Sequence, residues 1–186
     1  MAIQYNLDDV ERVFGVKYTP EQRASLKDIP FSDDVLKACA GTHMLFPGYP
    51  LSLLDVRAKF TDLFFSKTGG WYENQAFAQA PLPVRWHLLR MEPVPESLGK
   101  NWDEQRKLLL SDEVVPTAAL VAFATVLHFQ STKQRLFERC TVRMSDVDSD
   151  GDRVRVGDFD AGGFCVSGYW DGCRVGGLGV SASRKF

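Results

Sequence analysis

The stretch Val114-Val-Pro-Thr-Ala-Ala-Leu-Val-Ala-Phe-Ala-Thr-Val-Leu-His-Phe129 decides the fold, because nearly all of its side chains are aliphatic, aromatic or small. Only Pro116, Thr117, Thr125 and His128 interrupt the apolar run. A segment that is apolar on every side cannot remain in water, so we expect it to lie inside the protein. It is shorter than the roughly 20 apolar residues that cross a bilayer, so we expect no membrane span.

The residue spacing favours a helix for this segment. The pair Pro116-Thr117 suits a helix start, the alanines favour a helix, and Leu120 and Phe123 begin a pattern with intervals of three and four residues. A strand is the alternative, because alternate residues from Val121 to Phe129 would also share one face. The length of the run favours the helix, since buried strands are usually shorter.

After the polar segment Gln130–Gln134, the spacing of the apolar residues changes from the helical period to alternation with a period of two residues. The run Phe137–Met144 places Glu138, Cys140, Val142 and Met144 on one face and Phe137, Arg139, Thr141 and Arg143 on the other. This alternation predicts a strand with one side in water. The runs Arg153–Val156 and Phe164–Trp170 predict two more strands. Together they predict an antiparallel C-terminal sheet whose apolar face receives the central helix.

The first forty residues carry helix start signals at three places. Asn6, Thr19 and Ser32 are good N-cap residues, and Gly15 and Gly41 are good helix terminators. We therefore predict an α+β fold with short N-terminal helices, a buried central helix and a C-terminal antiparallel sheet. The length of 186 residues favours a single globular domain over residues 1–186, helical over about 1–80 and mixed over about 81–186.

The composition excludes some classes of partner and compartment. A net charge of −2 gives no general attraction to nucleic acids or acidic membranes, so a nucleic-acid partner is not expected, and a local basic patch is the alternative. The N-terminal residues lack the basic head and apolar core of a signal peptide, which predicts a cytoplasmic protein. No Cys-x-x-Cys pair occurs, and we expect free thiols in a reducing compartment at Cys39, Cys140, Cys165 and Cys173.

The candidate metal ligands lie in an acidic loop: they are Asp146, Asp148, Asp150 and Asp152. Alternate carboxylates before Gly151 match the opening of an EF-hand loop and offer the oxygen ligands that calcium prefers. The bidentate glutamate that an EF-hand needs at the twelfth position is replaced by Gly157, and the flanking segments predict strands. The sequence therefore favours a solvated hairpin turn over a specific calcium site.

A magnesium site is the enzymatic alternative for the same region. Asp158 and Asp160 would join the loop acids, and Arg153 or Arg155 would meet a phosphate. Nothing in the sequence fixes these groups in one cleft, so the hypothesis is a metal-dependent hydrolase or phosphoryl-transfer enzyme using Asp146–Asp160.

The histidines and Cys39 favour structural roles. Cys39 and His43 are four residues apart, but Cys39 falls at the end of a predicted helix, where the dipole disfavours a thiolate. His87 and His128 lie in apolar runs without an acidic or cysteine neighbour, which indicates hydrogen-bonded structural histidines.

The chain resembles uncharacterised bacterial hypothetical proteins through the segments 42–50, 135–138 and 148–154, which read THMLFPGYP, RLFE and DSDGDRV. No function follows from that resemblance. The leading hypothesis is a non-enzymatic binding or protein-interaction module, with another protein as the partner. The metal-dependent enzyme is the second hypothesis, and a calcium-stabilised structural domain is the third.

Overall fold

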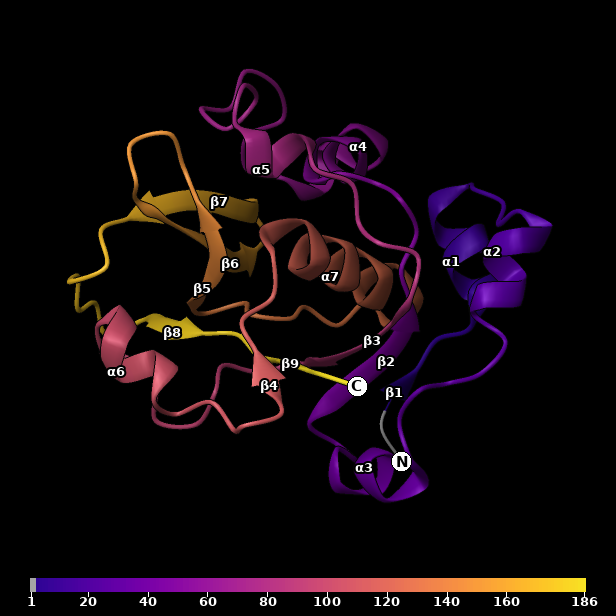
Figure 1. The fold of residues 1–186 in the computed structure, drawn as a ribbon. Helices are drawn as coiled ribbons and strands as arrows, with labels where there is room; N and C mark the ends of the chain where they lie inside the picture. Colours follow the sequence, from indigo (N-terminus) through magenta and orange to yellow (C-terminus); the bar gives the residue numbers. More distant parts are fainter. Residues whose placement is uncertain (1–2) are drawn as a thin grey trace.

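The central helix is the element on which the two sheets are built. The computed structural model describes residues 3–186 and shows α7 over Ala118–Thr132 between the sheets (Figure 1). The Thr117 hydroxyl accepts a hydrogen bond from the Leu120 amide, and Lys133 ends the helix in a left-handed conformation with φ 65°. Every residue from Ala118 to His128 is buried. The prediction of a buried helix is therefore confirmed, and the strand alternative is wrong.

The first sheet contains strands from both ends of the chain. It comprises β1 (Ile3–Gln4), β2 (His43–Pro47), β3 (Trp86–Arg90), β9 (Ser183–Arg184) and β4 (Glu113–Val114), in that order. β1 runs parallel to β2, and the other neighbours are antiparallel. The last strand thus lies between β3 and β4, which come from the middle of the chain (Figure 1).

The second sheet contains the predicted meander. Its order is β7 (Gly163–Tyr169), β6 (Arg153–Asp160), β5 (Thr141–Val147) and β8 (Leu178–Val180), with antiparallel β5–β6 and β6–β7 pairs. The sheet differs from a purely antiparallel one because β8 runs parallel to β5. The glycine-rich loop after β7 carries the chain back across the sheet before β8, so β8 and β5 point the same way.

The remaining helices are short. The three predicted N-terminal helices are α1 (Leu7–Phe14), α2 (Pro20–Ser25) and α3 (Asp33–Ala38), and their caps are Asn6, Thr19 and Ser32. The others are α4 (Leu53–Lys59), the 3-10 turn η1 (Thr61–Leu63), α5 (Ala76–Gln79) and α6 (Trp102–Arg106). Together with the sheets they confirm the α+β fold class.

Aromatic packing connects α7 to its neighbours. The Phe123 ring stacks on Phe14 of α1 at a centroid distance of 4.2 Å and on Phe46 of β2 at 5.9 Å. At the other end of the helix, Phe129 meets Phe159 of β6 edge to face at 5.2 Å. Ring pairs of this kind add stability beyond the area they bury. One helix therefore links α1, the first sheet and the second sheet.

One prediction for β5 is wrong. Thr141 to Met144 are all buried, so neither face of the strand lies in water along these residues. Arg143 has no exposed surface. Its guanidinium donates to the Lys100 carbonyl at 2.9 Å, to Gln105 Oε1 at 2.8 Å and to the Cys173 carbonyl at 2.7 Å. The loops before α6 and after β7 cover the face that the alternation places in solvent.

No helix within residues 3–186 combines the length and apolar character needed to cross a membrane. The four cysteines are free, as expected, and Cys39 is the one that is fully buried.

Candidate functional site

The acidic loop forms the turn between β5 and β6, and its first aspartate points away from the turn. Asp146 Oδ2 accepts a hydrogen bond from the Ala118 amide at 2.6 Å, in the first turn of α7. Burial raises the pKa of Asp146, although the amide contact opposes the shift. A carboxylate at a helix N-terminus satisfies one of the amides that the helix leaves free. Asp146 thus acts as a cap.

The other candidate ligands shape the turn itself. Asp148 Oδ1 accepts from the amides of Asp150 and Asp152, both at 2.9 Å, which is the local pattern that aspartate favours in turns. Ser149 exchanges two hydrogen bonds with the side chain of Gln75, so the turn is tied to the segment before α5. In residues 3–186, no group of three or more His, Cys, Asp or Glu side chains is arranged to hold a metal ion.

The twelfth position of the loop leaves no room for a side chain. Gly157 lies in β6 with φ 134°, and a Cβ there would approach the Cys140 carbonyl oxygen at 2.3 Å. The glutamate that completes an EF-hand therefore cannot be accommodated at this position. Calcium binding by the four aspartates stays a prediction.

The arginines of the phosphoryl-transfer hypothesis have other contacts. Arg153 makes two hydrogen bonds to the Asp171 carboxylate, at 2.9 and 3.1 Å, and lies 4.0 Å from the centroid of Trp102. Arg155 donates to Thr141 Oγ1 at 3.0 Å and lies over the Tyr169 ring. Both guanidinium groups are thus held against the second sheet.

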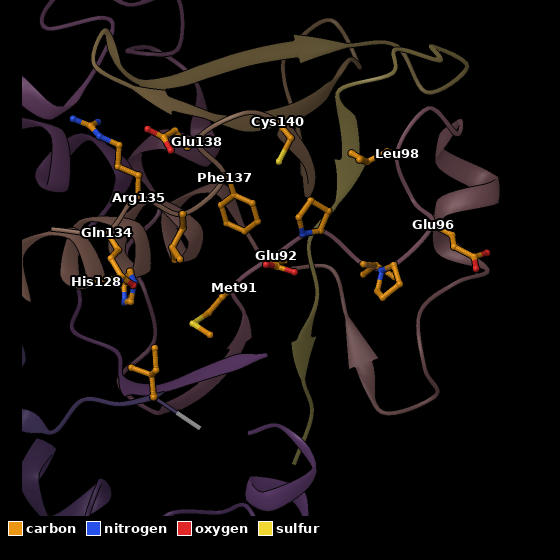
Figure 2. A pocket seen from close by; sticks show the side chains of 15 residues that line it. Met91, Glu92, Glu96, Leu98, His128, Gln134, Arg135, Phe137, Glu138 and Cys140 are labelled. Atoms are coloured by element: carbon orange, nitrogen blue, oxygen red, sulfur yellow. The ribbon is translucent and has the colours of Figure 1, made fainter. Parts of the chain in front are cut away.

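A hollow lined by apolar and acidic residues lies away from the acidic loop, and we call it the groove. It has a volume of about 550 Å³. Two segments face each other across it: residues 91–98, which follow β3, and residues 134–140, which lead into β5 (Figure 2). Ile3 and His128 complete the lining. The groove therefore combines parts of the chain that are far apart in sequence.

The floor of the groove is mainly apolar. Val94, Leu136 and Phe137 are buried beneath it, while Met91 is half-buried and Leu98 is exposed. Pro93 and Pro95 also line it. Because proline has no amide hydrogen, this wall offers few backbone donors and presents mostly hydrocarbon. Such a surface suits an apolar group of a ligand.

The rim of the groove is acidic. Glu92, Glu96 and Glu138 are exposed, and none of the three forms an ion pair or a side-chain hydrogen bond with any residue from 3 to 186. The one cation in the lining is Arg135, which donates to the backbone carbonyls of Phe159 and Asp160. Its guanidinium also lies 4.6 Å from the centroid of the Phe159 ring. The three carboxylates are therefore not neutralised by their surroundings.

Two of the titratable side chains that line the groove, the Cys140 thiol and the His128 imidazole, are shifted towards their neutral forms. Burial, assisted by Asp158 and Glu92, raises the pKa of the Cys140 thiol to about 11. Burial lowers the pKa of His128, whose Nδ1 lies 2.8 Å from the Tyr5 hydroxyl. A thiol that stays protonated is a poor nucleophile, and a buried neutral imidazole with a structural partner is a poor base. The arrangement favours binding over covalent chemistry.

The other two histidines are also buried. His43 Nδ1 lies 2.8 Å from the Thr42 hydroxyl, and its Nε2 lies 4.0 Å from Glu113 Oε1. Cys39 is fully buried, in agreement with a core position for both residues. His87 stacks on Phe46, and burial lowers its pKa to about 4. The sequence indicated structural roles for these histidines but gave no sign that β4 would bring Glu113 beside His43.

The sequence patterns did not predict the groove. The one available signal was the segment Met91-Glu-Pro-Val-Pro-Glu-Ser-Leu98, in which apolar residues, prolines and acids alternate without helix or strand periodicity. Its opposite wall is about forty residues further along the chain, so the two could not be paired from spacing alone. No protein-family model, no curated protein and no solved structure matches this chain.

Proposed function

We propose that the chain is a non-enzymatic binding module that recognises a segment of a partner protein through the groove. The partner segment would place an apolar side chain on the floor and basic side chains beside Glu92, Glu96 and Glu138. The observation that carries the proposal is an apolar floor beside three carboxylates that form no ion pair with residues 3–186. This arrangement would increase the association rate of a positively charged partner segment and would orient that segment in the groove.

The size of the groove supports this proposal. Its volume of about 550 Å³ falls within the range of roughly 300–1,000 Å³ that is usual for ligand-binding hollows. An apolar side chain bound there would be transferred from water to an apolar surface that includes Val94 and Phe137. The acidic rim would supply specificity more than affinity, because exposed ion pairs contribute only about 0.2–1 kcal/mol each.

The chemistry of the groove supports binding rather than turnover. The Cys140 thiol has a raised pKa, and the imidazole of His128 has a structural partner in Tyr5. Neither group is activated as a nucleophile or a base. We also infer that the module works in a reducing compartment, because its four cysteines are free.

A peptide-display selection tests the proposed function. The wild-type protein should enrich peptides in which lysine or arginine flanks an aliphatic or aromatic residue. The Glu92→Gln/Glu138→Gln variant should lose that enrichment and bind the selected peptides about tenfold more weakly, as expected for the loss of two favourable charge contacts. Tighter binding at low salt is also expected, because exposed charges are screened by ions.

The matched control removes two carboxylates elsewhere. Asp34 and Asp62 are almost fully exposed and pair only with Lys37 and Lys67 at the surface. The Asp34→Asn/Asp62→Asn variant has the same net charge as the groove variant and should bind the selected peptides like the wild type. Equal losses in both variants would show that total charge, not the groove, attracts the peptides, and the proposal would be rejected.

A further inference from the structure

A second hollow lies at the edge of the first sheet, and we call it the basic pocket. Its volume is about 280 Å³. It is formed where β3, β9 and β4 meet, and its lining residues are Arg85, Trp86, His87, Val114, Ser183, Arg184, Lys185 and Phe186. The lining differs completely from that of the groove, so this inference does not depend on the proposed function.

Three cationic side chains line the basic pocket, and one of them is paired with a carboxylate side chain. Arg85, Arg184 and Lys185 line it, and no aspartate or glutamate side chain does. Arg184 pairs through Nη1 with Asp112, but its Nε is buried and has no hydrogen-bond partner within residues 3–186. Arg85 forms no ion pair in the part of the chain that the structure describes. The chain as a whole carries a net charge of −2, so this concentration of cations is local.

The cations are presented beside aromatic surface. The Arg85 guanidinium lies 5.6 Å from the centroid of the Phe186 ring, and Phe186 in turn meets Phe31 edge to face. Lys185 Nζ donates to the Ser111 carbonyl at 3.2 Å, which leaves the ammonium two further hydrogens. Arginine offers a fork of donors that matches the oxygens of a carboxylate or a phosphate.

We propose that the basic pocket binds the carboxylate or phosphate group of a small organic anion. Arg85, Arg184 and Lys185 supply donors to the anionic group, and an aromatic or aliphatic body rests on Phe186. The volume is just below the range usual for drug-sized ligands, so the pocket takes one charged group and a small body rather than a polymer.

The test uses three probes, which are inorganic phosphate, phenyl phosphate and benzoate. Each is titrated into the full chain at constant ionic strength, and amide chemical shifts are followed by NMR. Constant ionic strength removes general screening from the comparison. We expect saturable shifts at residues 85–87 and 183–186, with phenyl phosphate or benzoate binding more tightly than inorganic phosphate. The tighter of the two aromatic probes identifies whether phosphate or carboxylate is preferred.

The variants decide between a built pocket and an incidental ion. Arg85→Gln/Lys185→Gln should weaken the binding of the best probe at least about tenfold, because two charged donors to the anionic group are lost. Arg12→Gln/Arg106→Gln, which removes two exposed arginines paired with Asp9 and Asp103, should bind like the wild type. Shifts that never saturate, or that persist in the pocket variant, would indicate an adventitious ion only and overturn the proposal.

Discussion

The Asp146 carboxylate accepts a hydrogen bond from the Ala118 amide at 2.6 Å, so the acidic loop and the buried helix are joined at one point. Asp146 lies near the end of β5, and eight residues separate α7 from β5. The contact nevertheless joins the end of the strand to the start of the helix. Because the half-buried Asp146 carboxylate caps the first turn of α7, it contributes to the fold as well as to the acidic loop.

Replacement of Asp146 tests its role as a helix cap. Asp146→Ala should lower the free energy of unfolding by about 1 kcal/mol, the usual cost of losing a side chain that caps a helix N-terminus. Asp146→Asn keeps an oxygen acceptor and should cost less. Urea unfolding followed by circular dichroism measures both variants. Asp150→Asn, in the same turn but exposed, is the control and should stay within about 0.5 kcal/mol of the wild type.

The pH dependence gives the sign of the Asp146 contribution. Burial raises its pKa above the ordinary value of 3.8, so the folded protein holds this proton to higher pH than the unfolded chain does. The contribution that this raised pKa makes to the free energy of unfolding is fully present below pH 3.8. It is lost as the pH rises through the pKa of Asp146 in the folded protein. Relative to Asp146→Asn, the wild type should therefore become less stable across that window. A wild-type advantage that grows with pH would contradict the burial argument.

Arg143 provides a second stability test. Its fully buried guanidinium connects Lys100, Gln105 and Cys173 to β5, and no carboxylate within residues 3–186 is hydrogen-bonded to it. Arg143→Ala would leave those acceptors without donors in the interior, so we expect a loss of about 3 kcal/mol in thermal or urea unfolding. Arg139→Ala removes an exposed arginine from the same segment and should change stability by less than about 0.5 kcal/mol. Similar effects in both variants would argue against the buried contacts of Arg143.

His87 should make the protein sensitive to acid. Burial, assisted by Arg85, lowers the pKa of His87 to about 4 from its usual 6.5. The unfolded chain therefore binds more protons than the folded one between these values, and stability falls as the pH drops from 6.5 toward 4. The shift corresponds to a contribution of up to about 3 kcal/mol for His87.

The variant His87→Gln isolates this contribution. It should be less stable than the wild type at neutral pH, but its stability should fall less steeply between pH 6.5 and 4, as measured by urea unfolding at a series of pH values. Part of the slope should remain, because burial also lowers the pKa of His43 to about 4. An unchanged slope in the variant would mean that His87 titrates normally in the folded protein.

Metal addition tests the two hypotheses that rest on the aspartates. We expect calcium, magnesium and manganese to leave the melting temperature unchanged relative to EDTA, because Asp146 and Asp148 already accept backbone hydrogen bonds. A rise in melting temperature with one of these ions that Asp148→Asn abolishes would instead establish a metal site at the turn. Asp62→Asn, a surface variant remote from the loop, serves as the control for charge.

The local elements were predictable because their signals are local. The apolar stretch that ends at Phe129 could be only a core element, and its alanines and helical spacing favoured α7. The caps Asn6, Thr19 and Ser32 each satisfy an amide three residues along, which is a contact that the sequence alone can specify. The alternation around the acidic loop likewise predicted the β5–β6 hairpin.

The sequence by itself determined the α+β class, the buried central helix and the turn at the aspartates, since these depend on periodicity and on contacts between near neighbours. Only the tertiary structure decided that β8 would lie parallel to β5, that Arg143 would be covered, and that the groove and the basic pocket would exist. Alternation along a strand specifies two faces but not what later covers them. Each of these features joins segments tens of residues apart, and their meeting depends on how the two sheets pack around one helix.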